Sequence, residues 1–253
     1  RDRGWLSVAG LFWLQEGVNT VGSGGGCAVR FPKPAPKRLG TLTLEGGAVR
    51  LDVARGVSVT LQDEPFTGAK LRMDADEGGP DKLRYKSLTF TIIKRGKRVG
   101  VRLYDDNAQT RRDFKGLAWY PVNPDLRIKA QFTPYTDGET MAITNVIGDT
   151  TMVKKAGYVS FTLGGKDCTL DAEATDDGLF INFADLTNRT TTYPAGRFLD
   201  TEKPQGGFVV LDFNRATNPP CAFTAFATCP LPPMANHLEV AIEAGEKRYA
   251  GGH

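Results

Sequence analysis

The sequence is poor in the residues that most often build metal centres and nucleophilic active sites. Its 253 residues include only four cysteines and two histidines, too few for a disulfide-stapled scaffold of this length. It contains no GxSxG, HExxH, P-loop or GxGxxG sequence, so the catalytic and nucleotide-binding classes with those signatures are not indicated. It also lacks any apolar run of about 20 residues, which excludes a membrane-spanning helix.

An excess of charge of one sign is also lacking. The chain has 32 Lys and Arg against 29 Asp and Glu, a net charge of +3, and its basic residues form short clusters. One of them, 94–98, reads as a hairpin turn. This balance gives no electrostatic basis for binding nucleic acid or a membrane surface. No signal peptide is visible, so we expect a cytoplasmic protein. We expect its partner to be a small molecule. The sequence does not indicate the oligomeric state.

Long helical periodicity is absent, whereas turn-forming residues are abundant. The 29 glycines and 15 prolines separate short runs of alternating apolar residues. We therefore predict an all-β protein, with an N-terminal β-sandwich followed by a second antiparallel β-sandwich or barrel. The expected strands are 28–31, 39–44, 48–53, 57–61, 87–93, 99–103, 126–132, 140–146, 157–163, 168–172, 179–183, 208–212 and 237–242.

Two segments bear on the domain organisation. Residues 5–14 fit either an apolar helical turn or two short buried strands around Gly10, and the glycines that follow favour strands. Residues 105–113 carry no apolar period and are rich in charge and turn formers. We place a boundary there, with one domain over 1–108 and a second over 109–253.

The first half resembles forkhead-associated domains. The resemblance is carried by Gly17–Ser23, Cys27–Phe31 and Gly40–Leu44 and extends from Gly17 to Tyr104, and it implies a β-sandwich. The family's arginine after the glycine is Ser23 here, and its Ser-x-x-His segment is missing. Because phosphothreonine recognition needs a cation and donors aimed at the phosphate, we do not transfer that activity to this chain.

Nearly the whole chain resembles a widespread prokaryotic family of unknown function. The resemblance implies no activity, substrate or cofactor. The segments that carry it are 10–14, 116–122, 183–187, 192–200, 211–223, 229–233, 236–238 and 244–247.

The proline-rich segment 212–233 is the first candidate site. Its prolines stiffen the backbone, and a rigid loop holds polar groups at little entropic cost. Arginine with flanking amides can grip a carboxylate, a phosphate or a sugar hydroxyl. Equally, such side chains can satisfy the loop's own backbone groups. The candidate ligand-binding residues are Tyr193, Arg197, Asp212, Asn214, Arg215, Asn218 and Asn236.

Two alternatives concern Arg197. An ion pair with Asp185 or Asp200 would lock a hairpin, whereas convergence with Arg215 would form an anion pocket. For a hydrolase, the candidate catalytic residues are His237 as a base and Asp185 and Glu246 as carboxylates. A lone histidine near a strand start is more often a structural hydrogen-bonding group.

The pair Cys221 and Cys229 has three possible interpretations. Cys221, Cys229 and His237 are evenly spaced but lack the close pairing of zinc ligands. We rank two buried thiols first, a disulfide between Cys221 and Cys229 second and a metal site last, and we expect no metal and no cofactor. The sequence thus predicts a protein that binds a small polar or anionic ligand through its C-terminal domain. The alternatives are a hydrolase-type enzyme with arginine anion clamps, or a protein-interaction module.

Overall fold

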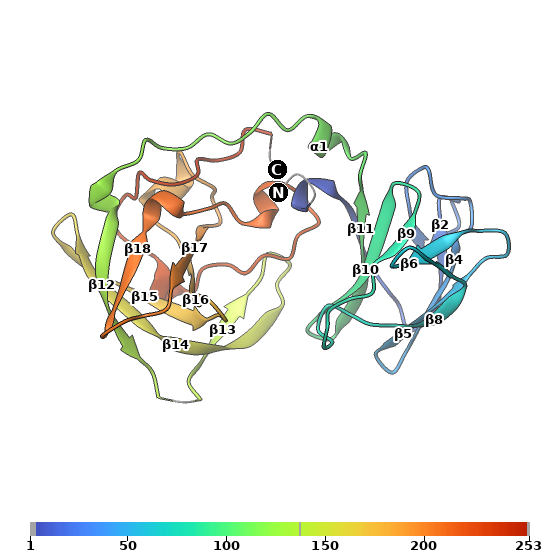
Figure 1. Ribbon diagram of the computed structural model, residues 1–253, viewed down its shortest axis with the longest axis horizontal. Helices are drawn as coiled ribbons and strands as arrows, with labels where there is room; N and C mark the ends of the chain where they lie inside the picture. Colours follow the sequence, from blue (N-terminus) through green and yellow to red (C-terminus); the bar gives the residue numbers. More distant parts are fainter. Residues whose placement is uncertain (1–3, 137, 252–253) are drawn as a thin grey trace. The chain divides into compact units, whose positions relative to one another are not determined.

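The computed structural model describes residues 4–136 and 138–251. The chain divides into two compact units, unit 1 over Arg1–Phe114 and unit 2 over Lys115–His253. The regular structure of each unit consists mainly of strands, with only short helical turns (Figure 1). The predicted all-β class is confirmed. The division follows helix α1 (Gln109–Arg112), which thus belongs to unit 1. Among the described residues, no helix is both long and apolar enough to cross a bilayer.

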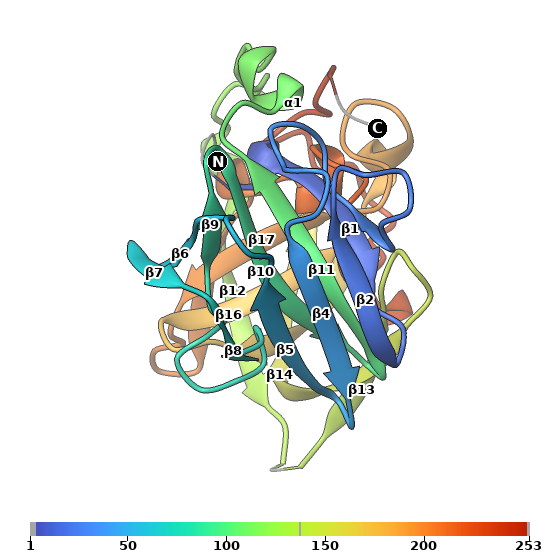
Figure 2. The ribbon, with the colours of Figure 1, turned by 90° about the vertical axis from the view of Figure 1, so that its right-hand side faces the viewer.

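Unit 1 consists of two stacked sheets. One has the strand order β1-β11-β10-β9-β6-β7 and the other the order β3-β2-β4-β5-β8, and Figure 2 shows β4 between β2 and β5. The elements are η1 (Trp5–Ser7), β1 (Val8–Trp13), β2 (Gly17–Gly22), β3 (Val29–Arg30), β4 (Gly40–Glu45), β5 (Ala48–Val53), β6 (Val59–Leu61), β7 (Glu64–Phe66), β8 (Gly68–Leu71), β9 (Leu83–Tyr85), β10 (Leu88–Arg95) and β11 (Arg98–Asp105).

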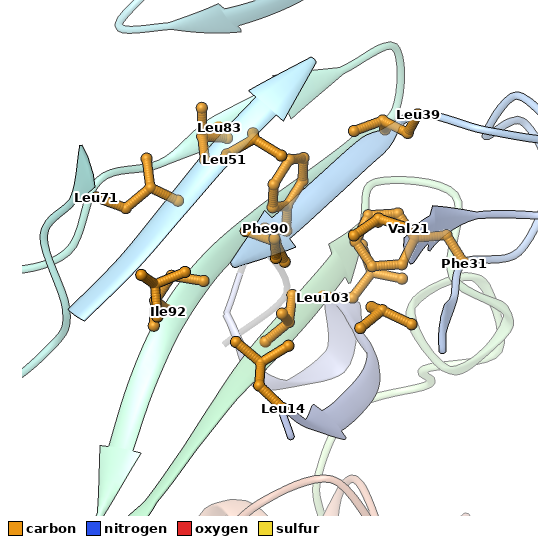
Figure 3. Close-up of a cluster of buried hydrophobic side chains, with 14 of the residues drawn as sticks. Leu14, Val21, Phe31, Leu39, Leu51, Leu71, Leu83, Phe90, Ile92 and Leu103 are labelled. Carbon is orange, nitrogen blue, oxygen red and sulfur yellow. The ribbon is translucent and has the colours of Figure 1, made fainter. Parts of the chain in front are cut away.

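The core of unit 1 lies between these sheets. Alternate residues of each strand point inward, so Val21 and Leu51 of one sheet meet Phe90 and Leu103 of the other (Figure 3). This alternation is what makes a two-layer sandwich the stable arrangement. The opening segment forms one 3-10 turn and one strand with a bulge between Val8 and Gly10, so the two strands expected around Gly10 are wrong. The likeness to forkhead-associated domains stays a prediction.

Unit 2 is a single curved antiparallel sheet with the order β17-β16-β15-β14-β12-β18, and β13 pairs with β14. The edge strand β17 meets the chain that follows β18 and η4, where Phe198 and Thr217 exchange backbone hydrogen bonds of 2.9 Å, which makes the sheet barrel-like. The elements are η2 (Pro124–Leu126), β12 (Arg127–Pro134), β13 (Thr140–Thr144), β14 (Thr150–Leu163), β15 (Lys166–Ala174), β16 (Gly178–Phe183), η3 (Leu186–Arg189), β17 (Arg197–Glu202), β18 (Phe208–Asp212), η4 (Phe213–Arg215), η5 (Pro220–Ala222) and η6 (Met234–Asn236).

The expected strand over 237–242 is wrong, although its alternation is real. Leu238, Val240 and Ile242 are buried in the core of unit 2. The amide of Leu238 donates to the carbonyl of Ala184 at 2.8 Å, and the amide of Leu186 donates to the carbonyl of Val240 at 3.0 Å. Both distances are typical of backbone hydrogen bonds between paired strands. The facing chain then turns into η3, so no continuous ladder forms. Residues 237–242 form an extended segment that fills part of the interior of the barrel-like sheet, and we call this segment the plug.

Candidate functional site

Arg197, at the start of β17, is buried inside unit 2. Its side chain is 0% exposed, and Nη2 donates to Oδ2 of Asp185 at 2.7 Å and to the carbonyl of Ile242 at 2.9 Å. Nη1 donates to the carbonyl of Ala244. The guanidinium lies over the ring of Phe183, 5.4 Å from its centroid. Arg197 therefore ties the turn after β16 to the C-terminal segment.

The carboxylate of Asp185 holds the turn that follows it. Oδ1 accepts hydrogen bonds from the amide of Thr187 at 2.8 Å and from its hydroxyl at 2.6 Å. The amide of Ile242 donates to the same oxygen at 3.2 Å. The Asn188 side chain accepts from the amide of Asp185, which completes a capping box on η3. Of the two pairings considered for Arg197, the structure has the one with Asp185.

Gly196 allows this close packing. Its φ is +90°, a conformation that strains other residues. A Cβ placed there would lie 2.7 Å from the carbonyl oxygen of Phe183. The glycine therefore lets β17 begin directly beside β16, with Arg197 pointing into the core.

Asn236 bridges two strands that have separated from each other. Its Oδ1 accepts from the amide of Asp171 at 2.7 Å, and its Nδ2 donates to the carbonyls of Asp171 at 2.9 Å and Asn182 at 2.8 Å. Strands β15 and β16 pair only through Glu173 and Ala174, so the amide replaces backbone bonds that these strands do not make with each other. Asn236 is 1% exposed, which makes it a structural link here.

Glu246 and Asn218 form a second buried link. Glu246 is 0% exposed, and its Oε2 accepts from the amide of Asn218 at 2.8 Å. Nδ2 of Asn218 donates to the carbonyl of Lys247 at 2.8 Å. These two residues hold the proline-rich loop against the end of the described chain.

Asn214 and Asp212 organise the turn after β18. The Asp212 carboxylate accepts from the amide of Asn214 at 3.2 Å and from its side chain at 3.0 Å. The Asn214 side chain also accepts from the amide of Asn123 at 2.8 Å and donates to its carbonyl at 2.9 Å. Asp212 therefore holds the turn itself, and Asn214 joins that turn to the backbone of Asn123.

His237 and Tyr193 lie apart from those buried groups. His237 is exposed, and its Nε2 lies 3.3 Å from the carbonyl oxygen of Pro232. Tyr193 is half-buried; burial raises the pKa of its phenol, and the charge of Arg248 opposes that change. The proposed base His237 is thus exposed, whereas the carboxylates of Asp185 and Glu246 are buried.

Arg215 and Asp212 line a cavity of about 350 Å³ on the outer side of unit 2. Buried Arg197 does not line it, so the structure does not bring the two arginines together. We call this cavity the β12–β18 groove. It is lined by Arg127, Lys129, Asp200, Thr201, Glu202, Lys203, Gln205, Phe208, Val209, Val210, Asp212 and Arg215.

The β12–β18 groove combines free cations with an apolar floor. Neither Arg127 nor Arg215 makes a side-chain hydrogen bond or ion pair with the described part of the chain. Phe208 is 42% and Val210 37% exposed, and the ammonium of Lys129 lies 4.4 Å from the ring centroid of Phe208. The sequence reasoning missed Arg127, Lys129 and Phe208. The sequence feature that could have identified them is the alternation of residues in β12 and β18, because it places these side chains on the outer face of the sheet.

The sequence also did not indicate a polar cluster formed by Tyr135, directly after β12, Lys155 of β14 and Asp171 of β15. The carboxylate of Asp171 accepts from the hydroxyl of Tyr135 and pairs with the ammonium of Lys155, each at 2.8 Å. Its hydrogen bond with Asp171 raises the pKa of Lys155, while burial raises the pKa of Tyr135. The Asp171 backbone is the one held by Asn236, so this cluster continues the structural link.

Cys221 and Cys229 form a disulfide with a Cα–Cα distance of 6.2 Å. The first-ranked prediction, two buried thiols, is therefore wrong, because the proline-fixed turns bring two residues eight apart in sequence into contact. Within residues 4–136 and 138–251, no group of three or more His, Cys, Asp or Glu side chains could hold a metal ion.

Removing this disulfide is expected to destabilise unit 2. The crosslink closes a short loop, and the entropy of closing it corresponds to about 2–3 kcal/mol. We expect a Cys221→Ala/Cys229→Ala chain to lose about that much free energy of unfolding in urea titrations. A Cys168→Ala chain, which removes a free buried thiol, serves as the matched control. Equal unfolding midpoints for the double variant and the unchanged chain would contradict the prediction.

One of the comparisons with known proteins identifies a family, and none of them names an activity. A family model described as "Protein of unknown function (DUF1684)" matches residues 112–247. An uncharacterised protein of Haloarcula marismortui, solved in solution by NMR, has 34% sequence identity over 54% of this chain and 78% of its own, with a TM-score of 0.45. No curated protein matches the chain.

Proposed function

The chain belongs to the DUF1684 family of proteins of unknown function, and we propose that its unit 2 binds a small anionic ligand in the β12–β18 groove. One observation carries this proposal: two guanidinium groups without partners among the described residues, those of Arg127 and Arg215, line the same cavity. Guanidinium groups bind carboxylates and phosphates through paired, charge-assisted hydrogen bonds.

The other walls of the groove limit the kind of ligand. Phe208 and Val210 offer apolar surface beside the cations, which favours a ligand with a ring or short hydrocarbon part. Asp200 and Glu202, from β17, line the same groove and would accept hydrogen bonds from hydroxyl or amino groups. The volume of about 350 Å³ lies at the lower end of the usual range for ligand pockets. We therefore propose a compact ligand with an anionic group at one end and hydrogen-bond donors at the other.

Titration with simple anions tests this function. Benzoate and inorganic phosphate are added to the isotopically labelled chain while backbone amide signals are followed by NMR. We expect the signals of Arg127, Phe208 and Arg215 to shift, and Arg215→Gln to weaken binding about tenfold, the value of a typical charge-assisted hydrogen bond.

The control is Arg189→Gln, which removes an exposed arginine from the same unit outside the groove. It should leave binding unchanged. If neither anion shifts the groove signals, or if Arg215→Gln and Arg189→Gln bind equally well, the groove is not an anion site.

A further inference from the structure

A second cavity, in unit 1, contains a buried arginine with unused hydrogen-bond donors. Arg102 of β11 is 5% exposed. Its Nε and Nη2 atoms are both buried and have no hydrogen-bond partner within residues 4–136 and 138–251. It lines a cavity of about 350 Å³ together with residues of η1, β10 and the segment before β9. We call this the Arg102 cavity; its lining is Gly4, Ser7, Asp74, Pro80, Lys82, Thr89, Thr91, Ile93, Arg102, Tyr104 and Asp106.

The strand register explains why these side chains meet. Val101 and Leu103 point into the sandwich core, so Arg102 between them points to the opposite face. Thr91 of β10 pairs with Arg102, and Thr89 pairs with Tyr104. The cavity floor is therefore a cross-strand set of a guanidinium and three hydroxyl-bearing residues.

The two carboxylates that line this cavity each form an ion pair with another arginine. Asp74 accepts from Nη1 of Arg95 at 2.6 Å and from the amide of Lys94 at 2.9 Å. Asp106 pairs with Arg84 at 2.9 Å. The positive charge of Arg102 is thus not neutralised by either carboxylate.

Arg102 keeps its charge despite this environment. Burial lowers its pKa, and Tyr104 acts in the opposite direction, but a guanidinium remains protonated in proteins. The indole of Trp5 stacks against it, with 5.0 Å between the guanidinium carbon and the ring centroid. Stacking fixes the guanidinium plane. A buried cation whose N–H groups lack acceptors raises the free energy of the folded state unless a bound group supplies those acceptors.

We propose that the Arg102 cavity binds a small organic carboxylate. Nε and Nη2 lie on one edge of the guanidinium, and that edge matches the two oxygens of a carboxylate in a bidentate pair. The hydroxyls of Thr89, Thr91 and Tyr104 supply further donors, while Pro80 and Ile93 offer apolar surface to the rest of the ligand. This site lies within unit 1 and is independent of the β12–β18 groove.

The test uses benzoate as the probe and benzamide as its neutral counterpart of the same shape. NMR titration of the whole chain should shift the amide signals of Thr91, Arg102 and Tyr104 with benzoate. Binding of benzamide, or of benzoate to Arg102→Met, should be at least tenfold weaker. Arg102→Lys keeps the charge without the two-donor edge and should also lose most of the binding, so a poorly folded Arg102→Met chain does not prevent the test.

Two further chains separate the outcomes. Arg50→Gln removes an exposed, ion-paired arginine of the same unit and should bind benzoate normally, as should Arg215→Gln at this site. Unchanged binding by Arg102→Met and Arg102→Lys, absence of benzoate shifts at Thr91 and Arg102, or tighter binding of inorganic phosphate would also overturn it.

Discussion

Replacing Asp185 with alanine is expected to lower the free energy of unfolding of unit 2 by about 3–5 kcal/mol. The substitution leaves the guanidinium of Arg197, whose side chain is 0% exposed, without its only carboxylate partner among the described residues. It also removes the acceptor for the amides of Thr187 and Ile242. An uncompensated buried charge is the largest of these costs.

Urea unfolding of the whole chain, followed by amide signals from each unit separately, measures this effect. Unit 1 should unfold at an unchanged urea concentration. Glu243→Gln, which neutralises an exposed carboxylate in the same C-terminal segment, serves as the control and should change stability by less than about 0.5 kcal/mol.

A paired replacement isolates the charge. The double variant Asp185→Leu/Arg197→Met removes both ions and leaves apolar side chains, so it should be more stable than Asp185→Ala alone. If Asp185→Ala unfolds at the same urea concentration as Glu243→Gln, the ion pair does not hold the turn to the C-terminal segment.

The strands that the sequence predicts best are those with one buried face and clear turns. Ala48–Val53 and Phe208–Asp212 occur with the expected bounds, because alternation of apolar and polar residues is a direct consequence of the pleated backbone. Strand β17 was missed because its inward positions begin with Arg197, a charged residue that alternation assigns to solvent. Only the facing carboxylate and the two carbonyls, all distant in sequence, make that burial possible.

In the candidate site, too, the local sequence identified some of the important polar residues and not others. The conspicuous polar residues of the C-terminal motifs, among them Asp185, Arg197 and Asn236, hold the plug in the barrel-like sheet. The cations that line the β12–β18 groove come instead from unremarkable strand positions such as Arg127. Motif composition identified where hydrogen bonds concentrate, but the distinction between structural and free polar groups depends on contacts that no local spacing encodes.

The second large effect is expected from Asn236→Ala, which should lower the free energy of unfolding of unit 2 by about 3 kcal/mol. The Asn236 side chain makes three hydrogen bonds with backbone groups of Asp171 and Asn182. Each buried backbone group left without a partner costs about 1–3 kcal/mol, and residue 236 is 1% exposed, which keeps water from replacing the amide.

Amide hydrogen exchange measures the local consequence. In the unchanged chain the amide of Asp171 donates to Oδ1 of Asn236; in Asn236→Ala it should exchange faster by at least the factor that corresponds to the lost stability. Asn236→Asp keeps the acceptor but loses both donors, so its Asp171 amide should stay protected while the carbonyls of Asp171 and Asn182 face a carboxylate. Met234→Ala, an exposed change in the same turn, is the matched control. Equal protection of the Asp171 amide in all of these chains would show that the strands β15 and β16 hold their separation without the asparagine.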